Sequence, residues 1–131
     1  MTKILKQTIN FEVDPETVYE ALMDPKIVEQ YTGQKAKIGQ KVGDKFTAYG
    51  DYIEGINLEL IKGKKIVQSW RASDWPKEHY SEVIFDLKKE GKGTKLIFTQ
   101  NNIPKEQFKE IEKGWEDYYW EPMREMFAKN Q

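Results

Sequence analysis

The last part of the chain carries the pattern that most restricts its fold, a long run of aromatic and apolar residues at helical spacing. After Pro104, which suits a helix start, these residues recur at steps of three and four: Phe108, Ile111, Trp115, Tyr118, Tyr119, Met123, Met126 and Phe127. Such steps place side chains on one continuous face of an α-helix. A helix of about 24 residues spans roughly 36 Å, which is long enough to cross a whole β-sheet. We therefore predict that a curved sheet wraps around this helix and buries its aromatic face.

The same spacing gives a direction to each residue of the segment GWEDYYWEPM, residues 114–123. Trp115 and Tyr118 are predicted to face the sheet, whereas Trp120 lies off that face. The segment also contains Pro122, which has no N–H to donate to the Tyr118 carbonyl and costs about 3 kcal/mol in an unsupported helix. We expect the helix to kink there and to follow the curvature of the sheet.

The start of the chain predicts one strand and two short helices. Apolar residues alternate with mainly polar ones at Leu5, Ile9, Phe11 and Val13, which is the pattern of a half-buried strand. The segments DPETVYEALM and DPKIVEQY follow, and each begins with aspartate and proline. Aspartate is a favoured N-cap because its carboxylate accepts from free backbone N–H groups, and proline suits the first helical position because it lacks an N–H.

From Gly43 onwards, alternating residues and glycine turns predict a meander of about six antiparallel strands. In its first part, the apolar residues predicted to share one face are at even-numbered positions: Phe46, Ala48, Tyr52, Ile56, Leu58 and Leu60. The turns KGKK and KKEGKG are expected at one end of the sheet, and the loop SDWPKEH at the other. One strand, two short helices, a meander and a long C-terminal helix is the order of the α+β helix-grip fold. The length fits a single domain, residues 1–131.

The composition excludes several classes of function. The 21 lysines and arginines nearly balance the 22 aspartates and glutamates, so no global field attracts nucleic acid or an anionic membrane. Cysteine is absent, which suits a reducing compartment, and we expect a cytoplasmic protein. No apolar stretch approaches the roughly 20 residues of a membrane span. One histidine and scattered carboxylates match no metal-ligand spacing, so neither a metal nor another cofactor is expected.

A catalytic role is not expected either. His79 is the only histidine and shares its strand face with Ser81. A serine hydrolase also needs an orienting carboxylate and an oxyanion hole, and the sequence HYS offers neither. Glu116 and Asp117 are neighbours on the solvated face of the long helix, so they cannot face each other across a cleft as glycosidase carboxylates do. We expect His79 to hydrogen-bond within its own loop.

Lysines gather at the two turns that are expected at one end of the sheet. Lys62, Lys64 and Lys65 belong to KGKK, and Lys92 belongs to KKEGKG. One interpretation is a contact for an acidic surface of a partner protein, and the other is ordinary solubility and protection of sheet edges. No exposed aromatic residue is identifiable among these lysines to stack on bases, so nucleic acid is not an expected partner.

The aromatic face of the long helix either packs into plain core or forms the wall of a cavity. The inward parity of the strands includes polar side chains, and a dry core tolerates polar atoms only when they are paired. A bulge at Gly55 would turn Glu54 outward and favour plain core. Both alternatives stay open from the sequence. The residues predicted to line such a cavity are Tyr52, Glu54, Gln68, Trp70, Phe85, Phe98, Gln100, Trp115 and Tyr118.

Three segments together resemble a known family: KIVQSWRASDWPKEHYSEVIFDL, NNIP and GWEDYYWEPM. The ordered set is similar to the C-terminal domain of the activator of the heat-shock protein 90 ATPase. That family is a branch of the helix-grip superfamily, together with birch-pollen-allergen-like and steroidogenic lipid-transfer-like domains. The most specific residues are Ile66, Val67, Trp70, Arg71, Trp75, Pro76, His79, Tyr80, Gly114, Trp115 and Tyr118.

The resemblance covers nearly the whole chain and implies a non-enzymatic co-chaperone domain. Such a domain binds the heat-shock protein 90 chaperone and favours its closed, ATP-hydrolysing form. The superfamily also implies an alternative, because its members often use the cavity between the sheet and the long helix for small apolar ligands.

Overall fold

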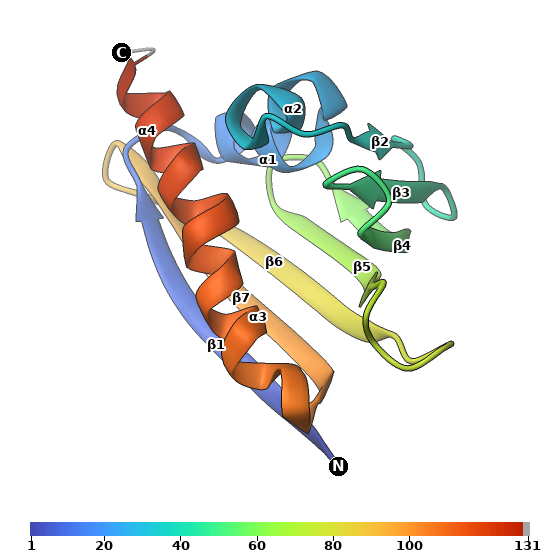
Figure 1. Ribbon diagram of the computed structural model, residues 1–131. Helices are drawn as coiled ribbons and strands as arrows, with labels where there is room; N and C mark the ends of the chain where they lie inside the picture. The colour runs from blue at the N-terminus through green and yellow to red at the C-terminus, as the bar shows by residue number, and fades with distance from the viewer. Residues whose placement is uncertain (130–131) are drawn as a thin grey trace.

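Residues 1–129 are described by a computed structural model, in which seven strands form one antiparallel sheet under a long C-terminal helix (Figure 1). Across this part of the chain the strand order is β1-β7-β6-β5-β4-β3-β2. The α+β helix-grip fold predicted from the sequence is confirmed. The strands are β1 (Thr2–Phe11), β2 (Lys37–Ile38), β3 (Lys45–Ala48), β4 (Ile53–Ile61), β5 (Lys65–Ala72), β6 (Ser81–Glu90) and β7 (Gly93–Pro104).

Two short helices follow β1, as predicted. They are α1 (Pro15–Met23) and α2 (Pro25–Thr32). The Asp14 carboxylate accepts hydrogen bonds from the Thr17 N–H at 2.9 Å and from the Thr17 hydroxyl at 2.7 Å. The Asp24 carboxylate accepts from the Lys26 N–H at 2.9 Å. The two predicted N-caps therefore determine where the helices begin.

The C-terminal helix lies across one face of the sheet, over β1, β7 and β6 (Figure 1). Its parts are a 3₁₀ turn (Lys105–Gln107), α3 (Phe108–Trp115), a π-helical turn (Glu116–Trp120) and α4 (Glu121–Lys129). Trp115 packs on Phe98 of β7 with 4.5 Å between ring centroids. Burial of each large apolar side chain stabilises the fold by about 1.5 to 3 kcal/mol. Because the helix and the sheet bury their largest side chains against each other, this contact forms the centre of the core.

The π-helical turn changes the direction of the residues inside the helix. Its hydrogen bonds span five residues, and the Glu121 N–H donates to the Glu116 carbonyl. Trp120 is only 1% exposed, whereas Tyr118 is 59% exposed. The prediction that Tyr118 faces the sheet and Trp120 does not is therefore wrong, because the helical period of 3.6 residues does not hold through this turn.

Pro122 follows the π-helical turn, and α4 continues through it to Lys129. Proline has no N–H for the carbonyl of Tyr118, four residues earlier. The Tyr49 hydroxyl donates to this carbonyl at 2.7 Å. Tyr49 lies in the loop between β3 and β4. The missing helical bond is thus replaced by one that ties the helix to this loop.

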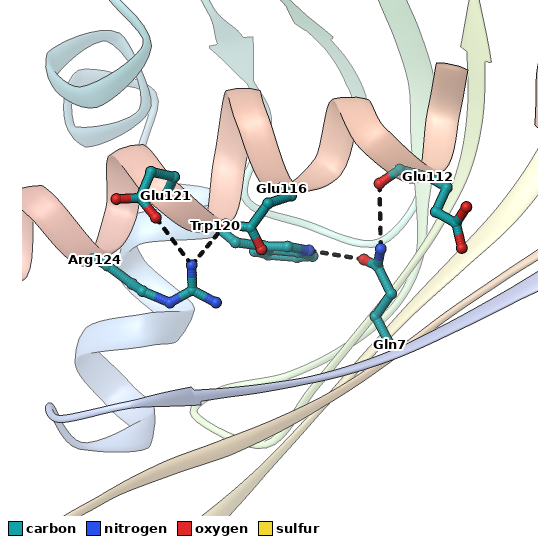
Figure 2. A network of polar contacts seen from close by, with 6 residues as sticks. All are labelled: Gln7, Glu112, Glu116, Trp120, Glu121 and Arg124. Atoms are coloured by element: carbon teal, nitrogen blue, oxygen red, sulfur yellow. Dashed lines mark hydrogen bonds and ion pairs between the residues drawn. The ribbon is translucent and has the colours of Figure 1, made fainter. Parts of the chain in front are cut away.

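On the side of β1, the helix is held by the side chain of Gln7 (Figure 2). Gln7 Oε1 accepts a 2.8 Å hydrogen bond from the indole N–H of Trp120, and Gln7 Nε2 donates to the Glu112 carbonyl at 3.3 Å. Figure 2 also shows Arg124 paired with Glu116 at 2.7 Å and with Glu121 at 3.3 Å. Gln7 therefore satisfies the buried indole and bridges the π-helical turn.

Strand β4 turns the opposite face to the core from the one that the sequence predicts. Three apolar side chains predicted to face the core are exposed, namely Tyr52 of the preceding loop, Ile56 and Leu58, whereas Leu60 beyond them is partly buried against the core. Ile53 and Asn57 are buried instead, and Gly55 lies between them. A Cβ on Gly55 would lie 1.8 Å from the Ser69 carbonyl oxygen, so this buried position has no side chain that a pattern could detect. A register shift between Asn57 and Glu59 then breaks the period of two.

Candidate functional site: an aromatic cleft and a basic end

A cleft of about 650 Å³ opens between the long helix and the loop that joins β3 to β4. Its volume is in the range of small-molecule sites. The residues of the helix side belong to α3 and the π-helical turn, and Trp70 comes from β5. The lining residues are Gln34, Tyr49, Tyr52, Ile53, Trp70, Glu110, Ile111, Lys113, Gly114, Trp115, Asp117, Tyr118 and Tyr119.

Four of the residues predicted to line a cavity lie at this cleft: Tyr52, Trp70, Trp115 and Tyr118. Gln68 and Phe85 instead line a void of about 30 Å³, which is far smaller than an organic ligand requires. Phe98 and Gln100 are fully buried in the core. The structure therefore brings aromatic members of the predicted set together and places the glutamines elsewhere.

The buried polar side chains near the cleft are paired with one another. The Trp115 indole N–H donates to Gln100 Oε1 at 2.7 Å, and Gln100 Nε2 donates to Ser81 Oγ at 3.0 Å. The Ser81 hydroxyl donates in turn to the Trp70 carbonyl at 2.8 Å. A closed chain of this kind makes polar atoms compatible with a dry core. The buried position of Gln100 thus has a structural explanation.

A second buried polar group holds the loop between β2 and β3. Gln68 Nε2 donates to Asn57 Oδ1 at 3.0 Å. Asn57 Nδ2 donates to the carbonyls of Gly39 at 2.7 Å and Lys41 at 3.1 Å. Both ends of the Asn57 amide are thus bonded, and the group ties two backbone carbonyls of this loop to β4 and β5.

Glu54 lies away from the cleft, on the outer side of β4. Its carboxylate accepts from the Tyr80 hydroxyl at 2.8 Å and lies 3.8 Å from Arg71 Nη1. Arg71 also donates to the carbonyls of Pro76 at 3.0 Å and Trp75 at 2.7 Å. Glu54 therefore belongs to the network that holds the loop between β5 and β6.

The backbone N–H of His79 donates within its own loop, to the Pro76 carbonyl at 3.1 Å, as predicted, whereas the ring bonds outside the loop. Its Nε2 lies 2.9 Å from the carbonyl oxygen of Asn102 on β7. A carbonyl only accepts, so Nε2 carries the proton in this contact. The ring also packs edge-on against Trp75, with 5.9 Å between centroids. His79 thus joins the β5–β6 loop to the end of β7.

Three phenols of the cleft stay neutral near physiological pH. Burial raises the pKa of Tyr49 to about 12. Burial and the Asp74 carboxylate, which accepts from the Tyr52 hydroxyl at 3.1 Å, raise the pKa of Tyr52 to about 12. Burial also raises the pKa of Tyr119. These groups therefore act as hydrogen-bond donors and as neutral aromatic surfaces.

The helix side of the cleft carries two carboxylates and one ammonium group. They belong to Glu110, Asp117 and Lys113. Lys113 Nζ lies 3.7 Å from Asp117 Oδ2, an i,i+4 pair on the helix surface. The Glu110 carboxylate acts on the Tyr52 pKa in the same direction as burial and Asp74, which contribute more. The charged groups of the lining have a net negative charge.

Sequence reasoning did not single out Gln34, Tyr49, Glu110, Lys113 and Asp117 as lining residues. The three helical residues follow one another at steps of three and four beside the aromatic stripe, and this spacing could have indicated them. Gln34 and Tyr49 come from two separate loops. They reach the cleft only through tertiary packing, for which the sequence has no local signal.

The lysines of the two turns lie at one end of the sheet. The Leu87 N–H donates to the Lys64 carbonyl at 2.8 Å, which places the β4–β5 turn beside the part of β6 that leads to the β6–β7 turn. Lys62, Lys64 and Lys92 are exposed. Lys65 is partly buried and lies 3.4 Å from a carboxylate oxygen of Glu59. We refer to Lys62, Lys64 and Lys92 as the basic end.

Residues 12–128 match the family model described as Activator of Hsp90 ATPase homolog 1-like protein. The chain belongs to this family. The resemblance found in the sequence is confirmed. Within residues 1–129 no helix is long and apolar enough to cross a membrane. In the same residues, no three histidine, aspartate or glutamate side chains are grouped so that they could hold a metal ion.

Two curated relatives have the same description. The activator of 90 kDa heat shock protein ATPase homolog of Dictyostelium discoideum is 30% identical over 128 residues, which are 97% of this chain and 33% of the relative. The human homolog 1 is 27% identical over 124 residues, which are 95% of this chain and 36% of the relative. The chain therefore spans about a third of the length of these relatives. Their names describe a regulator of an ATPase.

One solved structure matches this chain over nearly the full length of both chains. The crystal structure of an HSP90 activator from Plasmodium falciparum is 28% identical, with a TM-score of 0.89. The match covers 95% of this chain and 96% of that chain. A helix-grip chain of nearly the same length as this one therefore has the description of an activator.

Proposed function

We propose that this chain is a co-chaperone domain that binds a heat-shock protein 90 chaperone and stimulates its ATPase. The observation that carries the proposal is the family match over residues 12–128, which joins the chain to relatives named as activators of that ATPase. The Plasmodium falciparum activator supports it further, because its chain has nearly the same extent as this one.

The chain, on this proposal, acts by binding alone, as one helix-grip domain of the cytoplasm without a cofactor. The only histidine supports this interpretation, because His79 Nε2 is engaged by the Asn102 carbonyl and acts within a structural contact. The absence of cysteine is consistent with a reducing compartment.

The basic end supplies a contact for an acidic surface of the chaperone. Its three lysines are exposed and lie on two turns at the same end of the sheet. Charges arranged in this way accelerate association with a surface of opposite sign more than they strengthen the final complex. Exposed charges are screened over about 10 Å at 0.1 M salt, so raising the salt concentration should weaken this contact.

The test is the steady-state rate of ATP hydrolysis by a purified heat-shock protein 90 from the same source, with and without this chain. We expect a dose-dependent acceleration that falls as the salt concentration is raised. Absence of both acceleration and binding in calorimetry would reject the proposed function. Binding without acceleration would reject ATPase stimulation and leave a chaperone-binding domain.

The contribution of the basic end is tested with two triple variants of equal charge change. The test variant combines Lys62→Glu, Lys64→Glu and Lys92→Glu, and the control combines Lys77→Glu, Lys105→Glu and Lys109→Glu. The control lysines lie in the β5–β6 loop and at the start of the long helix, away from the basic end. We expect a large loss of association rate only in the test variant. Equal losses would reject the basic end as the contact and leave the function itself standing.

A further inference from the structure

The cleft beside the long helix has the side-chain composition of an aromatic cage. Six aromatic residues line it: Tyr49, Tyr52, Trp70, Trp115, Tyr118 and Tyr119. Tyr52 and Tyr118 are 42% and 59% exposed, so aromatic surface at the cleft is left uncovered. Contiguous exposed apolar surface and concave, mostly apolar sites with a few polar groups are typical of ligand binding.

The rings of the cage meet at steep angles. The ring planes of Tyr49 and Tyr118 are inclined by 71° with centroids 5.7 Å apart, and those of Tyr49 and Tyr119 by 71° at 5.9 Å. Trp70 and Trp115 lie 5.7 Å apart at 40°. The steeply inclined tyrosine rings therefore form adjoining walls of the cleft, while Trp70 and Trp115, which are 4% and 3% exposed, form its buried base.

The cage is held in place before any ligand arrives. The Tyr49 hydroxyl is fixed by its 2.7 Å bond to the Tyr118 carbonyl, and the Tyr52 hydroxyl donates to Asp74 at 3.1 Å. The Trp115 indole is bonded to Gln100 at 2.7 Å. A site formed in advance loses little conformational freedom when it binds, which favours affinity.

The charges around the cage favour a cation. Lys113 is paired with Asp117, and among residues 1–129 Glu110 has no lysine or arginine within ion-pair distance. Asp74 adds a further carboxylate through its bond to Tyr52. Aromatic faces attract cations because the ring quadrupole is negative above the plane, and tryptophan and tyrosine do so most strongly. Aromatic surface and carboxylates therefore select for the same ligand class.

We propose that this cleft binds a small quaternary ammonium compound. Its positively charged, methylated nitrogen lies among the aromatic rings, and the Glu110 carboxylate balances the charge. A quaternary ammonium group has no N–H to hydrate strongly, so it loses less on leaving water than a primary ammonium group does. The site does not depend on the proposed action on a chaperone.

The proposal is tested by titrating the whole chain with choline and with 3,3-dimethylbutan-1-ol, which has the same shape without the charge. Calorimetry and the indole N–H signals in ¹H–¹⁵N spectra report binding. We expect choline to bind at least about tenfold more tightly than the neutral alcohol, because a cation–π contact in a partly desolvated site has that magnitude. Equal binding of both compounds would show an apolar pocket, and no binding of choline would remove the site. Either result overturns the proposal.

Two variants separate the cage from general effects on the fold. Tyr118→Ala removes an exposed ring, while the carbonyl that Tyr49 bonds belongs to the backbone and stays. Glu110→Gln removes one charge at the surface. We expect each to weaken choline binding about fivefold or more, and Tyr80→Ala, which removes a 39% exposed tyrosine outside the cleft, to leave it unchanged. Wild-type binding in both cleft variants would place choline elsewhere and overturn the proposal.

Discussion

Trp115 and Trp120 stack with their ring centroids 5.4 Å apart and their planes inclined by 21°, although five positions separate them. In a regular α-helix, residues five apart point about 140° away from each other. Both rings also contact Phe98, at 4.5 and 5.5 Å between centroids. The π-helical turn is therefore what gives the core its second tryptophan from the long helix.

Truncating either tryptophan should destabilise the protein to a similar extent. Trp115→Ala and Trp120→Ala each remove a buried indole, and large aromatic deletions in cores cost about 3 to 5 kcal/mol. Urea denaturation followed by circular dichroism measures both. Regular helical spacing predicts a much smaller cost for Trp120→Ala, so a small cost would contradict the π-helical turn.

The bond between Tyr49 and the Tyr118 carbonyl should be worth most when residue 122 is proline. Tyr49→Phe removes the donor and should cost about 1 kcal/mol of unfolding free energy. In a Pro122→Ala background the new N–H can donate to the same carbonyl. A double-mutant cycle should therefore show a smaller cost of Tyr49→Phe in that background. Equal costs in both backgrounds would mean that the hydroxyl does not replace the proline's missing donor.

Two glycines should respond in opposite ways to alanine. A Cβ on Gly55 would lie 1.8 Å from the Ser69 carbonyl oxygen, so Gly55→Ala forces the two strands apart and should cost about 2 kcal/mol or more. A Cβ on Gly114 meets nothing closer than 3.8 Å, and its position in α3 favours alanine by about 0.5 to 1 kcal/mol. Thermal melting of the two variants gives the comparison. Tolerance of Gly55→Ala would show that the approach of β4 to β5 is looser than described.

Tyr49 should make the protein less stable in strong alkali. Its pKa rises from 10.0 to about 12 in the folded state, first through burial. Because the phenol is more easily ionised in the unfolded state, its contribution to stability is fully present below the pKa of the unfolded state. This contribution is lost as the pH rises through about 12, the pKa in the folded state. The stability difference between wild type and Tyr49→Phe should therefore shrink between about pH 9 and about pH 12. A constant difference over this range would contradict the burial of the phenol.

The parts of the fold that local chemistry determines were predictable. Asp14 and Asp24 are N-caps because an aspartate before a proline offers an acceptor where helical N–H groups are free. The apolar alternation of β1 and the spacing from Phe108 to Trp115 also correspond to buried faces. In these segments a single regular period holds from end to end.

The errors lie where a period is interrupted. At Gly55 the buried face carries no side chain, and within the π-helical turn Tyr118 and Trp120 point opposite to the directions that regular spacing gives them, whereas Met123 and Phe127 beyond the turn are buried as predicted. The cleft was predicted only in part, because Tyr49 and Gln34 reach it from loops. Gln100 resembled a polar lining residue, since its partner Trp115 is close only after the helix has packed on the sheet.

The π-helical turn also affects how this chain should be aligned with others. A turn with one extra residue acts like a single-residue insertion that the helix absorbs without moving its ends. After the turn, Phe127 still packs on Phe11, with 5.5 Å between centroids. A relative with a regular helix and one residue fewer reaches the same buried positions one residue earlier in its sequence, and each residue of an α-helix turns by about 100°. Alignments of this family therefore call for a gap within the helix wherever a relative lacks the residue, and a gapless alignment would equate buried positions with exposed ones.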